Sequence, residues 1–506
     1  MNPKTSKRFL QKLAVLLLAV AVPVVGQQKN TKSAPPPKTS APAAHPSTPA
    51  ATHPGSNNAG RPGAPSNNTS RPGTTNNASR PAATNNAARP GMAGNAGRGN
   101  ASATSRTAPG KTVSLKSGGT ANFRPNGQVR SINSHGMQIS RGFHGSRTVV
   151  STHNGARVVT TGAHGGFVQR AYFARGGRTY VSRTYVVGGR TYVNVYRSYG
   201  YGGYCCYYGW APAYYYGPAY YGWAYNPWPA PVYYGWGWGG APWYGYYGPY
   251  WAPYPVYPSA AFWLTDWMIA ASLQAAYAAR AEANAQLSPL APDLELVASL
   301  GAFPVPDETK VTMTKEVKDQ LAEEIKAQLG ADQADASKSG NASSGGQAAG
   351  NEPPPALDPK RPIFVVNDEV STAADGEECS LTQGDIISRT SETPDGDKNL
   401  QVKVLASSKT DCAVGKQVAV SLDDLQEMRN HLREQLSNGM DELSKKQGTG
   451  GLPKAPDTGK HDGEVPAPAA DSTATKALQD QQTAADQAEA EAKQANASGG
   501  TGGGQQ

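Results

Sequence analysis

The chain has 506 residues, of which 57 are Gly, 40 are Pro and only 38% are hydrophobic. This composition excludes large hydrophobic cores along the whole length, so ordered domains must be few and small. The charge is divided: residues 1–265 contain 26 Lys and Arg but no Asp or Glu, whereas the rest contains 21 basic and 38 acidic residues. Such asymmetry indicates a basic part that meets a polyanion, and an acidic part that maintains solubility or folds back on it.

The N-terminus has the pattern of an export signal. Four basic residues among the first twelve precede an apolar run at 13–25, which Gly26 and polar residues follow. A helix needs roughly 20 apolar residues to cross a bilayer, so the run predicts a signal peptide over 1–26 rather than an anchor. The protein is therefore expected to be exported to the periplasm, the cell surface or the medium.

Two segments that differ in composition follow the predicted signal peptide. Residues 27–110 are rich in Pro, Asn and Ala and repeat an Asn-Asn pair before Arg-Pro, which predicts a disordered basic linker. Residues 111–198 contain short runs such as Thr179-Tyr180-Val181 between Gly-containing turns about ten residues apart. This spacing predicts an antiparallel β-meander of about nine strands, with Arg mostly on its outward positions.

Residues 199–258 contain nineteen Tyr and seven Trp, interrupted by Gly and Pro. No regular periodicity survives these interruptions, so irregular turns are predicted, with rings that stack on each other, on the meander or on a ligand.

Helices are expected next. Residues 259–287 lack Pro and Gly and are largely apolar, but Asp266 near the middle disfavours a membrane span. A helix packed on the aromatic segment is the favoured interpretation, an interfacial helix or a span the alternatives, and no stable span is expected. Thr314 caps a second helix in a short helical region over 288–330, and a disordered linker is predicted over 331–356.

Residues 357–447 predict a small β domain with a C-terminal helix that Ser421 caps. Cys379 and Cys412 are candidates for a disulfide in this domain, as expected for an exported protein. Cys205 and Cys206 are adjacent, so free thiols or intermolecular partners are expected. The tail over 448–506 is predicted to be disordered apart from a frayed Ala-rich helix. The fold class is thus mostly β with helices and large disordered regions, and the small domain is barrel-like.

Motifs for catalysis and metal binding are not found. The chain lacks GxSxG, HExxH and GxxxxGK[ST], so it is interpreted as not an enzyme, and no cofactor is predicted. Histidines recur at the meander's turns and are interpreted as polar turn residues rather than metal ligands. Asp395, Asp397 and Asn399 imitate the start of a calcium loop, but the Gly and Glu that complete such a loop are absent, so a turn is predicted.

Four stretches carry a resemblance: 113–119 (VSLKSGG), 126–132 (NGQVRSI), 221–229 (YGWAYNPWP) and 418–428 (VAVSLDDLQEM). In these stretches, and in the order of its parts over about 112–447, the chain resembles a group of exported Gly/Tyr/Trp-rich bacterial proteins of the acidobacterial type. No activity is assigned to that group, so the resemblance implies no catalytic residue. The small domain is also similar in outline to SH3-like barrels.

The functional hypothesis is a non-enzymatic exported protein of the cell envelope or medium that binds an anionic envelope polymer. Arg would pair with its anionic groups, and rings would stack on its sugars. An exported binder of extracellular nucleic acid, or a self-associating surface scaffold, is the alternative. The candidate polymer-binding residues are Arg178, Arg183, Arg190, Trp236 and Trp238.

Overall fold

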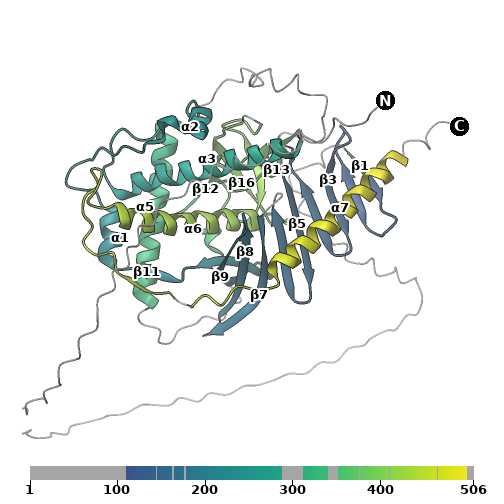
Figure 1. Ribbon diagram of the computed structural model, residues 1–506, viewed down its shortest axis with the longest axis horizontal. Helices are drawn as coiled ribbons and strands as arrows, with labels where there is room; N and C mark the ends of the chain where they lie inside the picture. Colours follow the sequence, from purple (N-terminus) through teal and green to yellow (C-terminus); the bar gives the residue numbers. More distant parts are fainter. Residues whose placement is uncertain are drawn as a thin grey trace, which may run out of the picture. The chain divides into compact units, whose positions relative to one another are not determined.

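The computed structural model describes most residues from 110 to 498 (Figure 1). The positions in this range that it does not describe are 144, 162–164, 176–177, 288–311, 340–351, 375–376, 410 and 464. The predicted signal peptide and nearly all of the predicted linker over 27–110 lie outside the described residues.

The largest unit of structure is a ten-stranded antiparallel sheet in which strands β1 to β10 follow each other in chain order. Its strands are β1 Lys111–Ser114, β2 Thr120–Phe123, β3 Val129–Ser134, β4 Met137–Arg141, β5 Arg147–His153, β6 Ala156–Thr161, β7 Gly165–Arg175, β8 Arg178–Val187, β9 Arg190–Tyr201 and β10 Tyr204–Ala211. The predicted meander is present, with one strand more than expected. The turn at Asn154 and Gly155 has φ of 49° and 71°, the positive values that a tight hairpin between twisted strands requires.

The aromatic segment is more regular than predicted. Strand β10 belongs to the large sheet, and burial alternates along it, with Tyr207, Gly209 and Ala211 buried. Beyond it lie β11 Tyr214–Tyr216, α1 Pro218–Tyr225, the 3-10 turn η1 Trp238–Gly240 and α2 Pro242–Tyr247. The fold of the described residues is therefore mixed rather than mostly β. The sequence signal that the prediction missed is the alternation of buried and half-buried residues along β10, which is short and is interrupted by Gly.

Two long helices cover the aromatic segment, α3 Ala260–Leu287 and α5 Lys315–Ser339. Asp266 of α3 is fully buried and lies 3.0 Å from the Nζ of Lys318 on α5. Its burial raises its pKa. Asp266 also accepts hydrogen bonds from the Tyr254 amide and the Tyr257 hydroxyl, at 2.6 and 2.9 Å. None of the helices among the described residues combines the length and the apolar character that a membrane crossing requires.

Helix α5 continues past Gly330 into the predicted linker over 331–356. Its last turns are held because Asp332 accepts a hydrogen bond of 2.7 Å from Arg433 of the following helix. A Cβ on Gly330 would meet nothing within 4 Å, which places this glycine at an open position of the helix.

The small domain has a four-stranded sheet in the order β12-β15-β16-β17 and a separate hairpin, β13-β14. The strands are β12 Ile363–Val365, β13 Val370–Ala374, β14 Glu377–Leu381, β15 Ile386–Arg389, β16 Asn399–Ala406 and β17 Gln417–Ser421, and η3 Pro355–Leu357 precedes them. The predicted barrel is not closed, because the edge strands β12 and β17 do not pair with each other. An SH3-like barrel is therefore not supported.

Helix α6 Leu422–Lys446 starts where the sequence predicts, and the Ser421 hydroxyl accepts a hydrogen bond from the Asp424 amide at 3.0 Å. Its apolar face joins two cores. Leu425 and Met428 pack among the strands of the small domain, whereas Leu436 and Met440 pack among the aromatic rings. The small domain is consequently integrated with the rest of the described chain through α6.

All four cysteines are paired in the structure. Cys379 of β14 is bonded to Cys412, with a sulfur–sulfur distance of 2.08 Å and Cα atoms 5.2 Å apart. Cys205 is bonded to Cys206 near the start of β10. The expectation that these two adjacent residues are free thiols or intermolecular partners is therefore wrong.

The sequence predicts a tail that is disordered apart from a frayed Ala-rich helix, whereas the described part of the tail, up to residue 498, contains a strand and a long helix that both pack on other elements. Strand β18 Lys460–Asp462 pairs with β11, and α7 Ala474–Ser498 lies across the strands of the large sheet (Figure 1). Composition misleads here because alanine offers little apolar surface. The helix instead gains its partners from residues more than 300 positions away, such as Arg141, which donates to Glu489.

Candidate functional site

Arg183 of β8 lies in the interface between the large sheet and α6. Its side chain is fully buried and forms a bidentate pair with Glu427 of α6, with nitrogen–oxygen distances of 2.7 and 2.6 Å. Its Nε donates to Gln169 at 2.8 Å. The expectation that Arg183 faces solvent is wrong, because β8 directs it toward α6 and not outward.

Aromatic rings complete the surroundings of this guanidinium. It lies 4.5 Å from the ring centre of Phe167 and 4.0 Å from that of Tyr196. Burial by itself would lower the pKa of Arg183, but the charge and hydrogen bond of Glu427, together with Tyr185 and Tyr196, outweigh burial and raise it. Burial would likewise raise the pKa of Glu427, yet Arg183 holds it below its usual value. The pair is therefore ionised and structural.

Ion pairs between arginines of the large sheet and distant carboxylates occur along most of the sheet. At least seven of the thirteen Lys and Arg between 111 and 197 pair with carboxylates of the acidic half. The pairs are Arg124 and Arg130 with Glu378, Arg141 with Glu489, Arg147 with Asp486, Arg170 with Asp471, Arg183 with Glu427, and Arg197 with Glu352. The acidic half thus folds back on the basic half, one of the two arrangements that the charge asymmetry indicates.

Trp236 and Trp238 belong to the aromatic core. Trp236 stacks on Trp238 with ring centres 4.3 Å apart and on the fully buried Trp263 of α3 at 4.7 Å. Its Nε1 donates to the Tyr257 hydroxyl at 2.6 Å. Both rings are only half-buried, but their faces are used in this stacking. The two predicted tryptophans therefore contribute to core packing. They lie in a different part of the structure from the interface that holds Arg183.

The structure reveals a row of three aromatic rings, exposed at one end, that sequence reasoning missed. Phe167, Tyr185 and Tyr192 lie side by side on β7, β8 and β9, with ring centres 5.2 and 5.0 Å apart. We call these three side chains the ring row. Its outer member, Tyr192, is 46% exposed. The TYV pattern shared by β8 and β9 could have indicated such cross-strand pairing.

The pair of Tyr185 and Tyr192 lies two residue pairs from the pair of Val187 and Arg190 that flanks the turn between β8 and β9. Val187 is 45% exposed and Arg190 is exposed. Burial, followed by the charge of Glu434 on α6, raises the pKa of Tyr192 to about 12. Its hydroxyl therefore stays protonated and can donate. Arg178, at the other end of β8, is half-buried. Of the three predicted arginines, Arg190 is the exposed one, and it borders the ring row.

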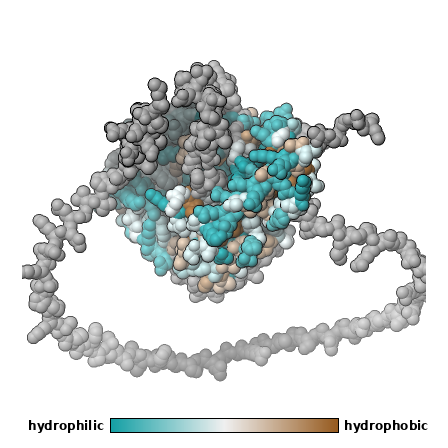
Figure 2. Space-filling model, turned by 45° about the vertical axis from the view of Figure 1, so that its right-hand side comes forward, coloured by the Kyte–Doolittle hydropathy of each residue, from teal (hydrophilic) through white to brown (hydrophobic). Residues whose placement is uncertain are grey.

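On the face that Figure 2 shows, hydrophilic residues of the described chain alternate with small apolar patches. A single exposed ring on such a surface is ordinary and does not by itself indicate a binding site. Tyr192 differs from Tyr233 because it extends a row of stacked rings.

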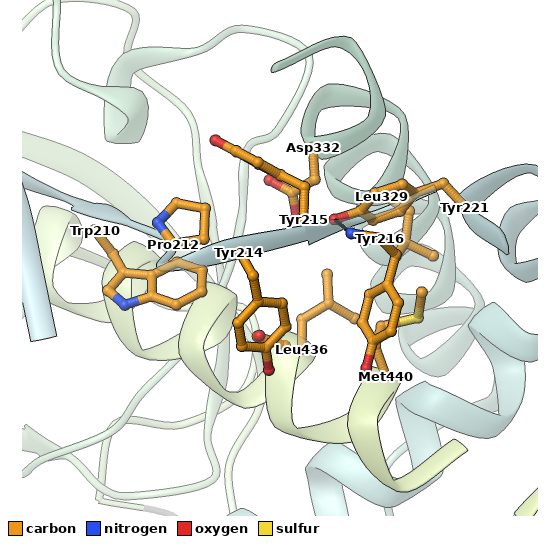
Figure 3. Close-up of a pocket in the computed structure, with 11 residues that line it drawn as sticks. Trp210, Pro212, Tyr214, Tyr215, Tyr216, Tyr221, Leu329, Asp332, Leu436 and Met440 are labelled. Atoms are coloured by element: carbon orange, nitrogen blue, oxygen red, sulfur yellow. Dashed lines mark hydrogen bonds between the residues drawn. The ribbon is translucent and has the colours of Figure 1, made fainter. Parts of the chain in front are cut away.

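A gap between β11, α5 and α6 is lined by tyrosines and by Leu329, Leu436 and Met440 (Figure 3). Its volume of about 10 Å³ has room for about one water molecule. Its polar groups already have partners, since Arg433 donates to Asp332 and Tyr214 donates to Asp441 at 2.8 Å. We interpret the gap as a packing defect.

A larger, open hollow of about 430 Å³ is lined by Arg124, Arg141, Phe143 and Lys493. The two arginines there are paired with Glu378 and Glu489.

His135 occupies a turn with φ of 51°, in agreement with its interpretation as a turn residue. Among the described residues there is no group of three His, Cys, Asp or Glu side chains that could hold a metal ion.

The described chain is thus a mixed α and β protein built on an open ten-stranded antiparallel sheet. No protein-family model, curated protein or solved structure matches it.

Proposed function

We propose that this is a non-enzymatic, exported interaction protein that binds an anionic polymer of the cell envelope through its basic, aromatic N-terminal half. The observation that carries the proposal is the ring row, with Tyr192 exposed at its edge and Arg190 exposed beside it. A flat ring next to a cation is the chemistry that a polymer of sugar rings and anionic groups would match.

The internal ion pairs limit which basic residues are available to bind the polymer. Arg183 and the other paired arginines are committed to carboxylates of the same chain. Residues 27–109, outside the described residues, contribute nine Lys and Arg and no acidic residue. Long-range attraction would therefore come from this basic segment, and local contact from Arg190 and Tyr192.

Polymer binding is tested with isolated envelope glycan in a pull-down assay. We expect Arg190→Ala to weaken retention mainly at low salt, because the Debye length falls from about 10 Å at 0.1 M to about 3 Å at 1 M salt. Tyr192→Ala should weaken it at every salt concentration, because stacking is not screened. Tyr233→Ala removes a ring that is 73% exposed elsewhere, and this control should bind like the unmodified protein.

The same assay with single-stranded DNA distinguishes the alternative. There stacking on Tyr192 would contribute roughly 1 to 3 kcal/mol per base. Retention on DNA alone would favour the exported nucleic-acid binder. Absence of retention on either polymer at low salt would contradict both forms of the proposal.

Export is tested separately. The mature chain is expected to begin near Gln27, because Gly26 is the small residue after the apolar run. N-terminal sequencing of material from outside the cytoplasm checks this. Removal of residues 1–26 should leave the protein in the cytoplasm, and normal export of that variant would contradict the signal peptide.

A further inference from the structure

The two disulfide bonds of the chain differ in burial. Cys379 is 7% exposed and Cys412 is fully buried, so their bond lies in the core of the small domain. Cys205 is exposed and Cys206 is half-buried. Thiol–disulfide exchange requires that a thiolate reach a sulfur atom. Of the two bonds, the Cys205–Cys206 bond is therefore the one that is open to exchange in the folded protein.

The Cys205–Cys206 bond lies at the end of β10 that follows the turn at 202–203. The pairing of β10 with β9 shifts in register between Cys205 and Tyr207, so Cys206 is the extra residue of a bulge. Beyond the shift the strand is held in place, because Tyr207 packs in the core of the small domain and the Trp210 amide donates to Asn430 of α6 at 2.8 Å. A reaction at the cysteines therefore affects one end of the strand and not its packed part.

The position of the two cysteines in the sequence argues against a purely structural bond. A disulfide stabilises a fold mainly by closing a loop of the unfolded chain, and a bond with a sequence separation of 1 closes none. After cleavage, however, the two thiols stay close to each other. Each thiol is then present at a high effective concentration near the other, which favours renewed closure. The pair is therefore suited to repeated reduction and oxidation.

We infer that Cys205–Cys206 is a site of thiol–disulfide exchange that accepts two electrons from a dithiol. A thiolate of the dithiol attacks the Sγ of the exposed Cys205, the bond between the cysteines breaks, and Cys206 leaves as a thiolate. The second thiolate of the dithiol then attacks its own sulfur in the mixed disulfide and releases Cys205. The two protons that the dithiol loses pass through water to the two cysteines.

The products are a protein with two thiols and a dithiol that has been oxidised to its disulfide. The same steps in reverse, with a disulfide as the oxidant, close the Cys205–Cys206 bond again. This inference does not rest on polymer binding, because it uses neither the ring row nor Arg190.

Selective labelling of the unmodified, full-length protein tests the inference. The folded protein is treated with dithiothreitol, free thiols are alkylated, and peptide mass spectrometry measures how fast each cysteine is labelled. We expect Cys205 and Cys206 to be labelled at least about tenfold faster than Cys379 and Cys412, because exchange depends on access. Near-ultraviolet circular dichroism verifies that the protein remains folded.

A second arm with reduced thioredoxin distinguishes the two sources of a dithiol. Faster reduction of Cys205–Cys206 by thioredoxin than by dithiothreitol, at equal dithiol concentration, would assign a protein dithiol as the substrate. Slower reduction by thioredoxin would assign a small dithiol.

Two single variants identify the attacked sulfur. Cys206→Ala lacks the thiol that resolves a mixed disulfide, so oxidised glutathione should leave a glutathione adduct on Cys205. Cys205→Ala is the matched variant, and its Cys206 should be modified at least about tenfold more slowly, because Cys206 is less exposed. Equal rates in the two variants would overturn the assignment of Cys205 as the attacked residue.

The unmodified protein, once reduced, should return to the Cys205–Cys206 bond when oxidised glutathione is added. A pair that does not close again overturns the inference. So does a Cys205–Cys206 bond that is reduced no faster than the Cys379–Cys412 bond, or the recovery of two free thiols at 205 and 206 from protein that was purified in air.

Discussion

Replacing Arg183 by alanine is expected to lower the free energy of unfolding by about 3 kcal/mol, the lower end of the range for breaking a buried ion pair. Arg183 has no exposed surface, and Glu427 is 39% exposed. The remaining carboxylate would be partly hydrated, which limits the loss. The substitution also removes the cation that lies against Phe167 and Tyr196, so packing adds to the effect.

Urea denaturation followed by tryptophan fluorescence measures this change. The matched control is Arg190→Ala, seven positions along the hairpin and exposed, which should stay within about 0.5 kcal/mol of the unmodified protein. Adding Glu427→Gln to Arg183→Ala should recover part of the loss, because no uncompensated carboxylate is then left. Equal stabilities for Arg183→Ala and Arg190→Ala would show that the buried pair contributes nothing.

Loss of the Cys379–Cys412 bond is expected to cost roughly 3 to 4 kcal/mol by the chain-entropy model. The bond spans a sequence separation of 33 residues, and its removal frees that loop in the unfolded chain. The effect should be measured on the full chain, because α6 of the small domain also packs in the aromatic core.

The double variant Cys379→Ala, Cys412→Ala provides the measurement, since both cysteines are buried and alanine leaves no unpaired polar group. The matched control is Cys205→Ala, Cys206→Ala, whose bond has a sequence separation of 1 and closes no loop. A melting temperature that falls equally in both variants would contradict the loop-closure account.

Several local features could be predicted from the sequence alone. The Gly-containing turns that divide the meander, the start of α6 at Ser421 and the turn at Asp395 all depend on residues a few positions apart. Asp395, for example, accepts hydrogen bonds of 2.9 Å from the amides of Asp397 and Asn399, which is a turn and not a calcium loop. Such contacts form within one short segment, so their signals are complete there.

The tertiary structure alone decided how the charges are used. The sequence determined that the N-terminal half is basic and the C-terminal half acidic, but Arg183 meets Glu427 across 244 positions and Arg141 meets Glu489 across 348. It also decided that the Ala-rich helix of the tail docks on the large sheet as α7 and that Trp236 stacks in the core. The physical reason is that burial of an arginine or docking of an alanine helix depends on the surface supplied by distant segments, which no local pattern of residues contains.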